Sequence, residues 1–234
     1  MGTQDSSLKT QHSLAGLPCY DAPMLAAVVL ASIMAGAVFS LLHAIRVGDR
    51  TKEVMSKTAA SAAFVLLGAV RWSAGEPIDT WLIAALALCA AGDLCLLFDR
   101  SFDLGLISFL LGHLAYVAGF AVALPLRSWS LLILMPMVAA GAIAWRWLWP
   151  HLGQRRLSVT AYIIAISIML WGGVSVSTGG VLPWSAAAGA ILFYLSDLAV
   201  ARHRFVHQDF VNRAIGLPLY YLGQLLLALT IGAG

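Results

Sequence analysis

Long apolar runs recur through this chain and leave little choice of fold. Each run is about 18 to 24 residues long, which is enough to cross a bilayer as an α-helix that rises 1.5 Å per residue. The chain is 61% hydrophobic and only 11% charged, whereas soluble domains carry about 25% charged residues. These features exclude an ordinary soluble domain and predict an all-α, polytopic bundle of transmembrane helices.

We predict about eight spans joined by short connections, and no second domain. The spans are Met24–Ile45, Val54–Trp72, Trp81–Phe98, Leu104–Leu124, Trp129–Trp149, Val159–Ser177, Trp184–Ala201 and Ile215–Gly232. Residues 1–21 are polar and contain no apolar segment typical of a secretory signal, so we expect a disordered tail before a single membrane domain, residues 22–234.

Basic residues are distributed unequally between the two sides of the predicted bundle. The even-numbered connections hold only Arg71 and Arg127, and the remaining bases after the tail belong to the odd-numbered side. Because cytoplasmic loops are enriched in Lys and Arg, the odd side is predicted to be cytoplasmic and both termini to face away from it. The net charge of +3 follows from this topology, and we expect no nucleic-acid partner.

Two aspartates interrupt otherwise apolar spans. Asp93 lies in "AAGDLCLLF" and Asp197 in "FYLSDLAVA", each four or five residues before the cytoplasmic end of its span. Helical rise places both carboxylates at the same depth, roughly 6 to 8 Å from the inner boundary. Ionisable residues at membrane depth usually serve a function or pair with a base.

Other polar side chains are predicted in the same half of the membrane, and together they indicate a polar pocket that opens to the cytoplasmic leaflet. They are Lys57, His113, Tyr116, Arg204, Tyr220, Tyr221 and Gln224. A structural interpretation remains open for each of them, because either aspartate could simply pair with Lys57 or Arg204. The histidine and tyrosines could likewise serve helix packing.

No metal site or disulfide framework is predicted. His203 and His207 are four residues apart in a basic connection, but no cysteine or further histidine lies nearby in the sequence to complete a zinc site. Cys89 and Cys95 fall on roughly opposite faces of one helix, so we interpret them as small packing residues.

The segments "GDLCLLFDRSFDLGLISFLLGHLAYVAGF", "GAILFYLSDLAVARHRF" and "YYLGQLLLAL" resemble the YhhN and TMEM86 family of integral membrane proteins, whose characterised members are lysoplasmalogenases. The resemblance extends from Lys57 onward. One departure is Thr58, where the family usually has proline, and this affects the start of a helix rather than the chemistry.

The resemblance implies hydrolysis of the vinyl ether bond of a lysoplasmalogen to a fatty aldehyde and glycerophosphoethanolamine or glycerophosphocholine, without a cofactor. Asp93, Asp197 and His113 are the implied catalytic residues. The implied substrate-binding residues are Lys57, Tyr116, Ser196, Arg204, Tyr220, Tyr221 and Gln224. Of two neighbouring buried carboxyl groups, one can keep its proton and act as an acid while the other is ionised and acts as a base. We therefore expect Asp93 and Asp197 to act as a pair, as the two carboxylates of glycosidases do.

Two other functions remain open. The aspartates could relay protons or bind a cation in a transporter or lipid-binding protein. A zinc-dependent intramembrane amidase or lipase would need more histidines than His43 and His113, the two that lie in spans. The sequence leaves the oligomeric state open, and we expect a bacterial inner membrane as the location.

Overall fold

The computed structural model describes residues 22–73 and 75–233 and consists of helices joined by short connections. The predicted disordered tail, residues 1–21, lies outside the described residues. The eight long helices are α1 (Ala22–Val47), α2 (Arg50–Arg71), α3 (Pro77–Cys95), α4 (Phe102–Ala123), α5 (Leu131–Leu148), α6 (Arg156–Thr178), α7 (Trp184–Ala201) and α8 (Phe210–Thr230). The predicted all-α fold is confirmed.

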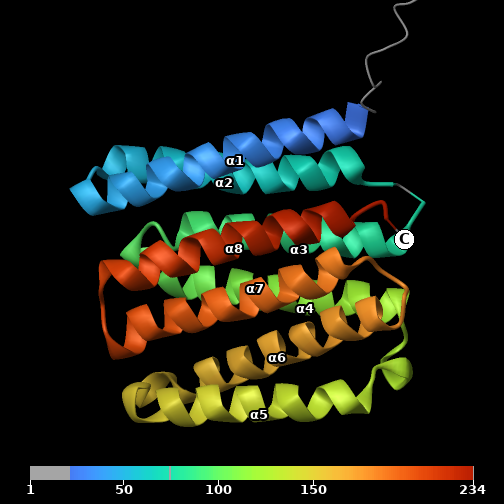
Figure 1. Ribbon diagram of the computed structural model, residues 1–234. Helices are drawn as coiled ribbons and strands as arrows, with labels where there is room; N and C mark the ends of the chain where they lie inside the picture. Colours follow the sequence, from blue (N-terminus) through green and yellow to red (C-terminus); the bar gives the residue numbers. More distant parts are fainter. Residues whose placement is uncertain (1–21, 74, 234) are drawn as a thin grey trace, which may run out of the picture.

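Apart from α4 and α5, helices adjacent in the sequence pack as antiparallel neighbours, as their short connections favour. The most extensive pairings are α1 with α2, α3 with α4 and α7 with α8. Figure 1 shows α1 and α2 at one edge of the bundle, α5 and α6 at the other, and α3, α4, α7 and α8 between them. The central helices therefore have neighbours on several sides, where polar groups can be shielded from lipid.

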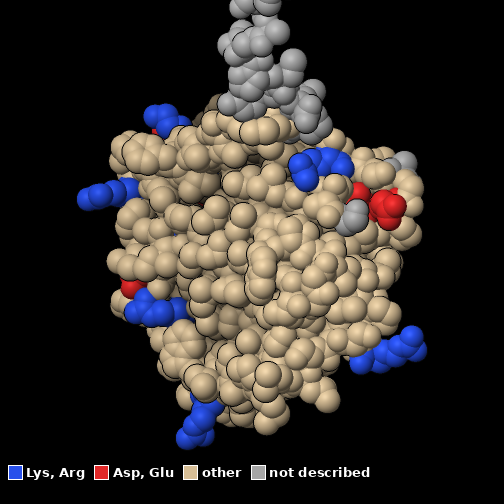
Figure 2. Space-filling model, turned by 45° about the vertical axis from the view of Figure 1, so that its right-hand side comes forward, with Lys and Arg blue, Asp and Glu red and all other residues tan. Residues whose placement is uncertain are grey.

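Seven of the helices in the described part of the chain, α1 to α7, are long and apolar enough to cross a membrane. The protein is thus an integral membrane protein. We expected an eighth span, but α8 does not meet the same measure of apolarity because it includes Asn212, Arg213 and Gln224. It nevertheless lies alongside α3 and α7 (Figure 1). On the face drawn in Figure 2, charged residues occupy the two ends of the helices and leave an uncharged band between them.

Two aspartates set helix starts that the apolar runs do not reveal. Asp49 accepts a hydrogen bond from the Lys52 amide at the start of α2, and Asp209 accepts one from the Asn212 amide at the start of α8. A side-chain oxygen at this position satisfies an amide that has no partner within the helix. Both helices consequently begin several residues before the predicted spans.

Glycines let α7 and α8 approach closely in the centre of the bundle. A Cβ atom at Gly223 would lie 3.0 Å from the carbonyl oxygen of Gly189, and one at Gly189 would lie 2.9 Å from the carbonyl oxygen of Gly223. Any side chain at either position would force the backbones apart. This contact holds the inward-facing residues of α7 and α8 next to each other.

The connections α1–α2, α3–α4, α5–α6 and α7–α8 all lie at one end of the bundle (Figure 1). We call it the basic end, because these are the connections to which the sequence assigned nearly all the bases. At the opposite end of the bundle, the carboxylate of Asp79 accepts hydrogen bonds from the backbone amides of Ser73 and Gly232. This buried carboxylate therefore has a structural role, linking the α2–α3 connection to the end of α8.

Candidate functional site

Asp93 is buried in the core and forms an ion pair with Lys57. The Lys57 Nζ atom lies 3.2 Å from Asp93 Oδ1, and the exposed fractions of the two side chains are 11% and 3%. Lys57 comes from the first turns of α2 and Asp93 from the end of α3, so the packing of α2 on α3 creates the pair. Desolvated charges are costly unless they are paired and hydrogen-bonded, and this geometry favours an ionised carboxylate opposite an ammonium ion.

Two hydroxyl groups complete the surroundings of Asp93. Ser61 Oγ donates a hydrogen bond of 2.7 Å to Asp93 Oδ2, and the Tyr221 hydroxyl lies 3.5 Å from the same oxygen. Ser61 lies one helical turn after Lys57, so both face α3 from the same side of α2. Hydrogen bonds to a carboxylate favour its charged form.

Asp197 occupies a second cluster with His113. The His113 Nε2 atom lies 3.1 Å from Asp197 Oδ2, and the histidine side chain is completely buried. The Tyr162 hydroxyl, from α6, lies 3.4 Å from the same carboxylate oxygen. Side chains of α4, α6 and α7 therefore converge on Asp197.

The two ring nitrogens of His113 have different surroundings. Its Nδ1 atom lies 2.7 Å from the carbonyl oxygen of Phe109, so Nδ1 must carry a hydrogen. A bare Nε2 lone pair facing an ionised carboxylate would be repulsive, and Nε2 has no aligned hydrogen-bond partner among the described residues. The contact with Asp197 is consequently attractive only when one further proton resides on either Nε2 or the carboxyl group.

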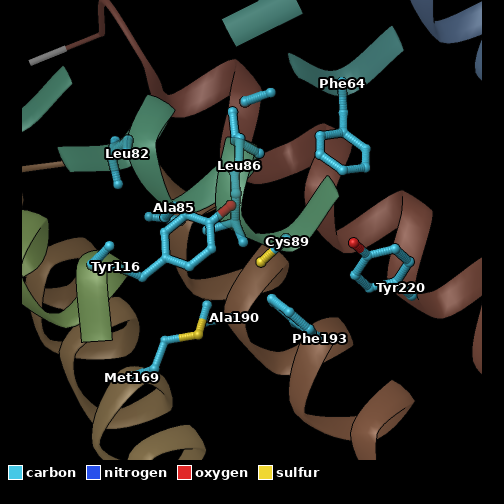
Figure 3. Close-up of a cluster of buried hydrophobic side chains, with 14 of the residues drawn as sticks. Phe64, Leu82, Ala85, Leu86, Cys89, Tyr116, Met169, Ala190, Phe193 and Tyr220 are labelled. Carbon is cyan, nitrogen blue, oxygen red and sulfur yellow. The ribbon is translucent and has the colours of Figure 1, made fainter. Parts of the chain in front are cut away.

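Aromatic rings connect the two clusters. Phe193 packs against His113 with ring centroids 4.4 Å apart, Tyr220 packs against Phe193 at 5.3 Å, and Tyr221 packs against Tyr220 at 4.9 Å. Figure 3 shows Cys89, Phe193 and Tyr220 in one cluster of buried side chains. No hydrogen bond among the described residues joins Asp93 to Asp197, and each carboxylate has a base of its own.

Unpaired polar atoms also lie in this core. The Tyr116 hydroxyl donates a hydrogen bond of 2.7 Å to Gln224 Oε1, while Gln224 Nε2 and the Tyr220 hydroxyl have no partner among the described residues. Both side chains are at least nine-tenths buried. Unsatisfied buried groups are costly, so their presence together suggests a place for a polar ligand or water.

Two of the predicted site residues lie apart from these clusters. Ser196 is buried, but its hydroxyl donates to the carbonyl oxygen of Phe193 within its own helix. Arg204 is exposed at the basic end, in a π-helical turn that continues α7, with its Cζ atom 4.0 Å from the centre of the Phe102 ring.

Sequence reasoning missed two participants. No role was predicted for Ser61 or Tyr162, and both contact a carboxylate. Ser61 could have been found from its spacing of four residues after Lys57, since residues i and i+4 share a helix face. No comparable signal exists for Tyr162, because its contact with Asp197 depends on how α6 packs against α7.

Within residues 22–73 and 75–233, no group of three or more His, Cys, Asp or Glu side chains could hold a metal ion. An apolar groove of about 420 Å³ lies between α5 and α6, lined by residues that include Gly141, Thr160, Ile164 and Ser167. Tyr162 faces away from this groove, since it lies about half a turn around α6 from Ile164.

The fold and the buried acid–base pairs define a helical membrane protein with a polar site in its core. A family model described as the YhhN family matches residues 52–231, and the chain belongs to this family. Every one of the predicted site residues falls within the matched region. The expected family resemblance is thereby confirmed.

Curated relatives are named lysoplasmalogenases. The chain is 35% identical over 160 residues to "Lysoplasmalogenase TMEM86B" of Sus scrofa, covering 68% of this chain and 66% of that protein. It is 32% identical over 151 residues to "Lysoplasmalogenase" of Mycobacterium bovis, covering 60% and 55%. It is also 27% identical over 175 residues to "Lysoplasmalogenase TMEM86A" of Homo sapiens, covering 71% of each. The chain thus spans just under two thirds of the length of the TMEM86B relative. No solved structure matches it significantly.

Proposed function

We propose that this protein is an intramembrane hydrolase that cleaves the vinyl ether bond of a lysoplasmalogen. The observation that carries the proposal is the presence of two buried acid–base pairs, Lys57–Asp93 and His113–Asp197, in the membrane core. The names of the curated relatives supply the substrate class. The products are a fatty aldehyde and glycerophosphoethanolamine or glycerophosphocholine.

The chemistry of a vinyl ether needs one proton donor and one proton acceptor. The His113–Asp197 couple donates its proton to the β-carbon of the double bond, and the adjacent carbon becomes an oxocarbenium ion. Water adds to that carbon and gives up a proton, producing a hemiacetal. Collapse of the hemiacetal breaks the carbon–oxygen bond to glycerol: the hemiacetal hydroxyl loses its proton as the carbonyl forms, the glycerol oxygen gains a proton, and the aldehyde leaves. The proton released by the attacking water replaces the one delivered to the β-carbon, so the acid is restored for the next turnover.

The two pairs take different roles in this proposal. Asp93 is the ionised carboxylate, because Lys57 and the hydroxyl groups of Ser61 and Tyr221 stabilise its charge. It stabilises the oxocarbenium ion and receives the proton of the attacking water. Gln224 and Tyr220, whose polar atoms have no partner among the described residues, position that water or the ether oxygen. The aspartates therefore cooperate as an acid and a base without direct contact.

The test is aldehyde release from 1-alkenyl lysophosphoethanolamine by detergent-purified protein, with and without a chelator. We expect chelator-resistant activity that Asp93→Asn and Asp197→Asn both abolish, and that the exposed control Glu76→Gln retains. Near-normal turnover in either aspartate variant would exclude this mechanism. Chelator-sensitive activity would favour the zinc hydrolase. If folded protein releases no aldehyde, uptake into proteoliposomes driven by a proton gradient tests the transporter.

The proposed location rests on the unequal distribution of basic residues between the two ends of the bundle. We propose that the basic end faces the cytoplasm of a bacterial cell, so that both termini lie on the other side of the inner membrane. A phosphate-bearing substrate then reaches the site from the cytoplasmic leaflet. Alkaline phosphatase fused after Arg127 should be active in intact cells and inactive when fused after Arg146, and the reverse pattern would invert the topology.

A further inference from the structure

We propose that Arg155 and Arg204, which both lie against the ring of Phe102 at the basic end, bind the phosphate group of the substrate. The inference rests on the proposed function and names a part of the site that no sequence argument identified as a unit. Lys57, which the resemblance implied to bind substrate, is not part of this phosphate site, because its ammonium group is paired with Asp93 inside the core.

Both guanidinium groups are held by the same aromatic ring. The Cζ atom of Arg204 lies 4.0 Å from the centre of the Phe102 ring, and that of Arg155 lies 5.1 Å from it. Contact of this kind engages the flat face of a guanidinium group and leaves the N–H donors at its edge available. Those edge donors match the oxygen atoms of a phosphate in paired hydrogen bonds.

Two like charges gathered at one ring repel each other, and an anion between them would offset that repulsion. Asp103 already supplies one negative group, since its Oδ1 atom lies 2.7 Å from Arg155 Nη1. Its side chain is 74% exposed, so this pair is of the weak, solvent-screened kind that can exchange for another anion. The Asp103 contact thus engages one edge of the Arg155 guanidinium group and can be replaced by another anion.

The arginines lie between the Asp197 cluster and the basic end of the bundle, because the same three helices carry both groups of residues. At the basic end, Phe102 of α4 contacts two arginines. Arg155 directly precedes α6 in the chain, and Arg204 follows the end of α7. Deeper in the bundle, His113 of α4, Tyr162 of α6 and Asp197 of α7 meet in turn. Asp197 and Arg204 are seven residues apart, a rise of roughly 10 Å.

This arrangement matches the layout of a lysophospholipid. Its phosphate and its vinyl ether are separated by the three carbons of glycerol, and arginine has a long side chain that can reach toward the membrane. With the phosphate at Arg155 and Arg204, the vinyl ether points along α7 toward Asp197. The headgroup region of the membrane is also where anions approach a protein surface.

The experiment compares two substrates in dodecyl maltoside, a detergent without phosphate. For 1-alkenyl lysophosphoethanolamine, Arg155→Gln and Arg204→Gln should each raise KM about tenfold with little change in kcat, the loss expected for one charged hydrogen-bonding group. For 1-alkenylglycerol, which lacks phosphate, the same variants should match the unmodified protein. Arg204→Lys should restore part of the affinity, and the control Arg146→Gln at the same end should leave both substrates unaffected. Equal effects on the two substrates, or no effect on either, would overturn the proposal.

A binding measurement separates this proposal from the proposed function. The saturated analogue 1-alkyl lysophosphoethanolamine cannot react, and it should raise the melting temperature of the unmodified protein more than that of Arg204→Gln. This difference is expected even if no aldehyde is ever released, whereas aldehyde release with equal stabilisation of both proteins would reject only the arginine site.

Added lipids and salts identify the source of the phosphate. Inorganic phosphate should compete with the substrate in the unmodified protein and lose this effect in Arg204→Gln. If the arginine variants differ from the unmodified protein only after phosphatidylglycerol is added, the arginines bind bulk anionic lipid and the proposal is wrong.

Discussion

The Nε2 atom of His113 lies 3.1 Å from Oδ2 of Asp197, while the Nδ1 atom of the same ring faces the Phe109 carbonyl oxygen. This orientation fixes which ring nitrogen meets the carboxyl group. In the proposed mechanism, the two side chains act as one acid that shares a single proton. The consequences of this pairing and of the other contacts can be measured.

The first prediction is that His113 and Asp197 act together as one proton donor. His113→Asn and Asp197→Asn should each lower kcat for vinyl ether hydrolysis by about 10² to 10⁴, the range for loss of general acid catalysis. The double variant should be no slower than the slower single variant, since residues that act as one unit are not additive. Single-turnover kinetics would measure this, and effects that multiply would show that the two side chains act independently.

The second prediction concerns the buried ion pair. Lys57→Met should lower the stability of the folded protein by about 3 to 5 kcal/mol, because it leaves the Asp93 carboxylate buried without a counter-charge. Lys57→Met combined with Asp93→Leu should recover much of this loss but none of the activity. Thermal unfolding in detergent, followed by circular dichroism, makes the comparison. A double variant as unstable as Lys57→Met would contradict the uncompensated charge as the cause.

The third prediction concerns the close contact of α3 and α4. A Cβ atom at Gly112 would lie 2.8 Å from the Cys89 sulfur, so Gly112→Ala should destabilise the protein by about 1 to 3 kcal/mol through overpacking. Activity should also fall, because the shift displaces the adjacent His113. Cys89→Ala in the same chain should relieve both effects. Failure of this compensation, measured by melting and by aldehyde release, would locate the clash elsewhere.

The fourth prediction concerns acid stability at the start of α8. The hydrogen bond from the Asn212 amide, aided by Arg202, holds the pKa of Asp209 below its ordinary value of 3.8. An aspartate with a lowered pKa stabilises the folded protein above its unfolded pKa, and this contribution is lost as the pH falls through the folded pKa. The melting temperature should therefore decline on acidification below about pH 4, and less so in Asp209→Ala. Parallel pH profiles for the two proteins would exclude this contribution.

The sequence was sufficient to predict the long helices and the relative depth of the two aspartates within them. Asp93 and Asp197 each interrupt an apolar run near one end, and the 1.5 Å helical rise places them at a common depth without further information. The first residues of the helices were harder to predict from the sequence. The apolar pattern does not extend to Asp49 or Asp209, whose side chains cap α2 and α8. Capping depends on local hydrogen bonds rather than on periodicity.

The sequence by itself therefore determined an all-helical membrane bundle, its basic end and most, but not all, of the polar residues in its core. Only the tertiary structure decided that Lys57 pairs with Asp93, that His113 pairs with Asp197, and that Ser61 and Tyr162 join them. The physical reason is that helical rise sets depth within each helix, whereas the choice of partner depends on how the helices rotate and pack against one another. Close approaches such as that of Gly189 to Gly223 fix that packing between residues far apart in the chain.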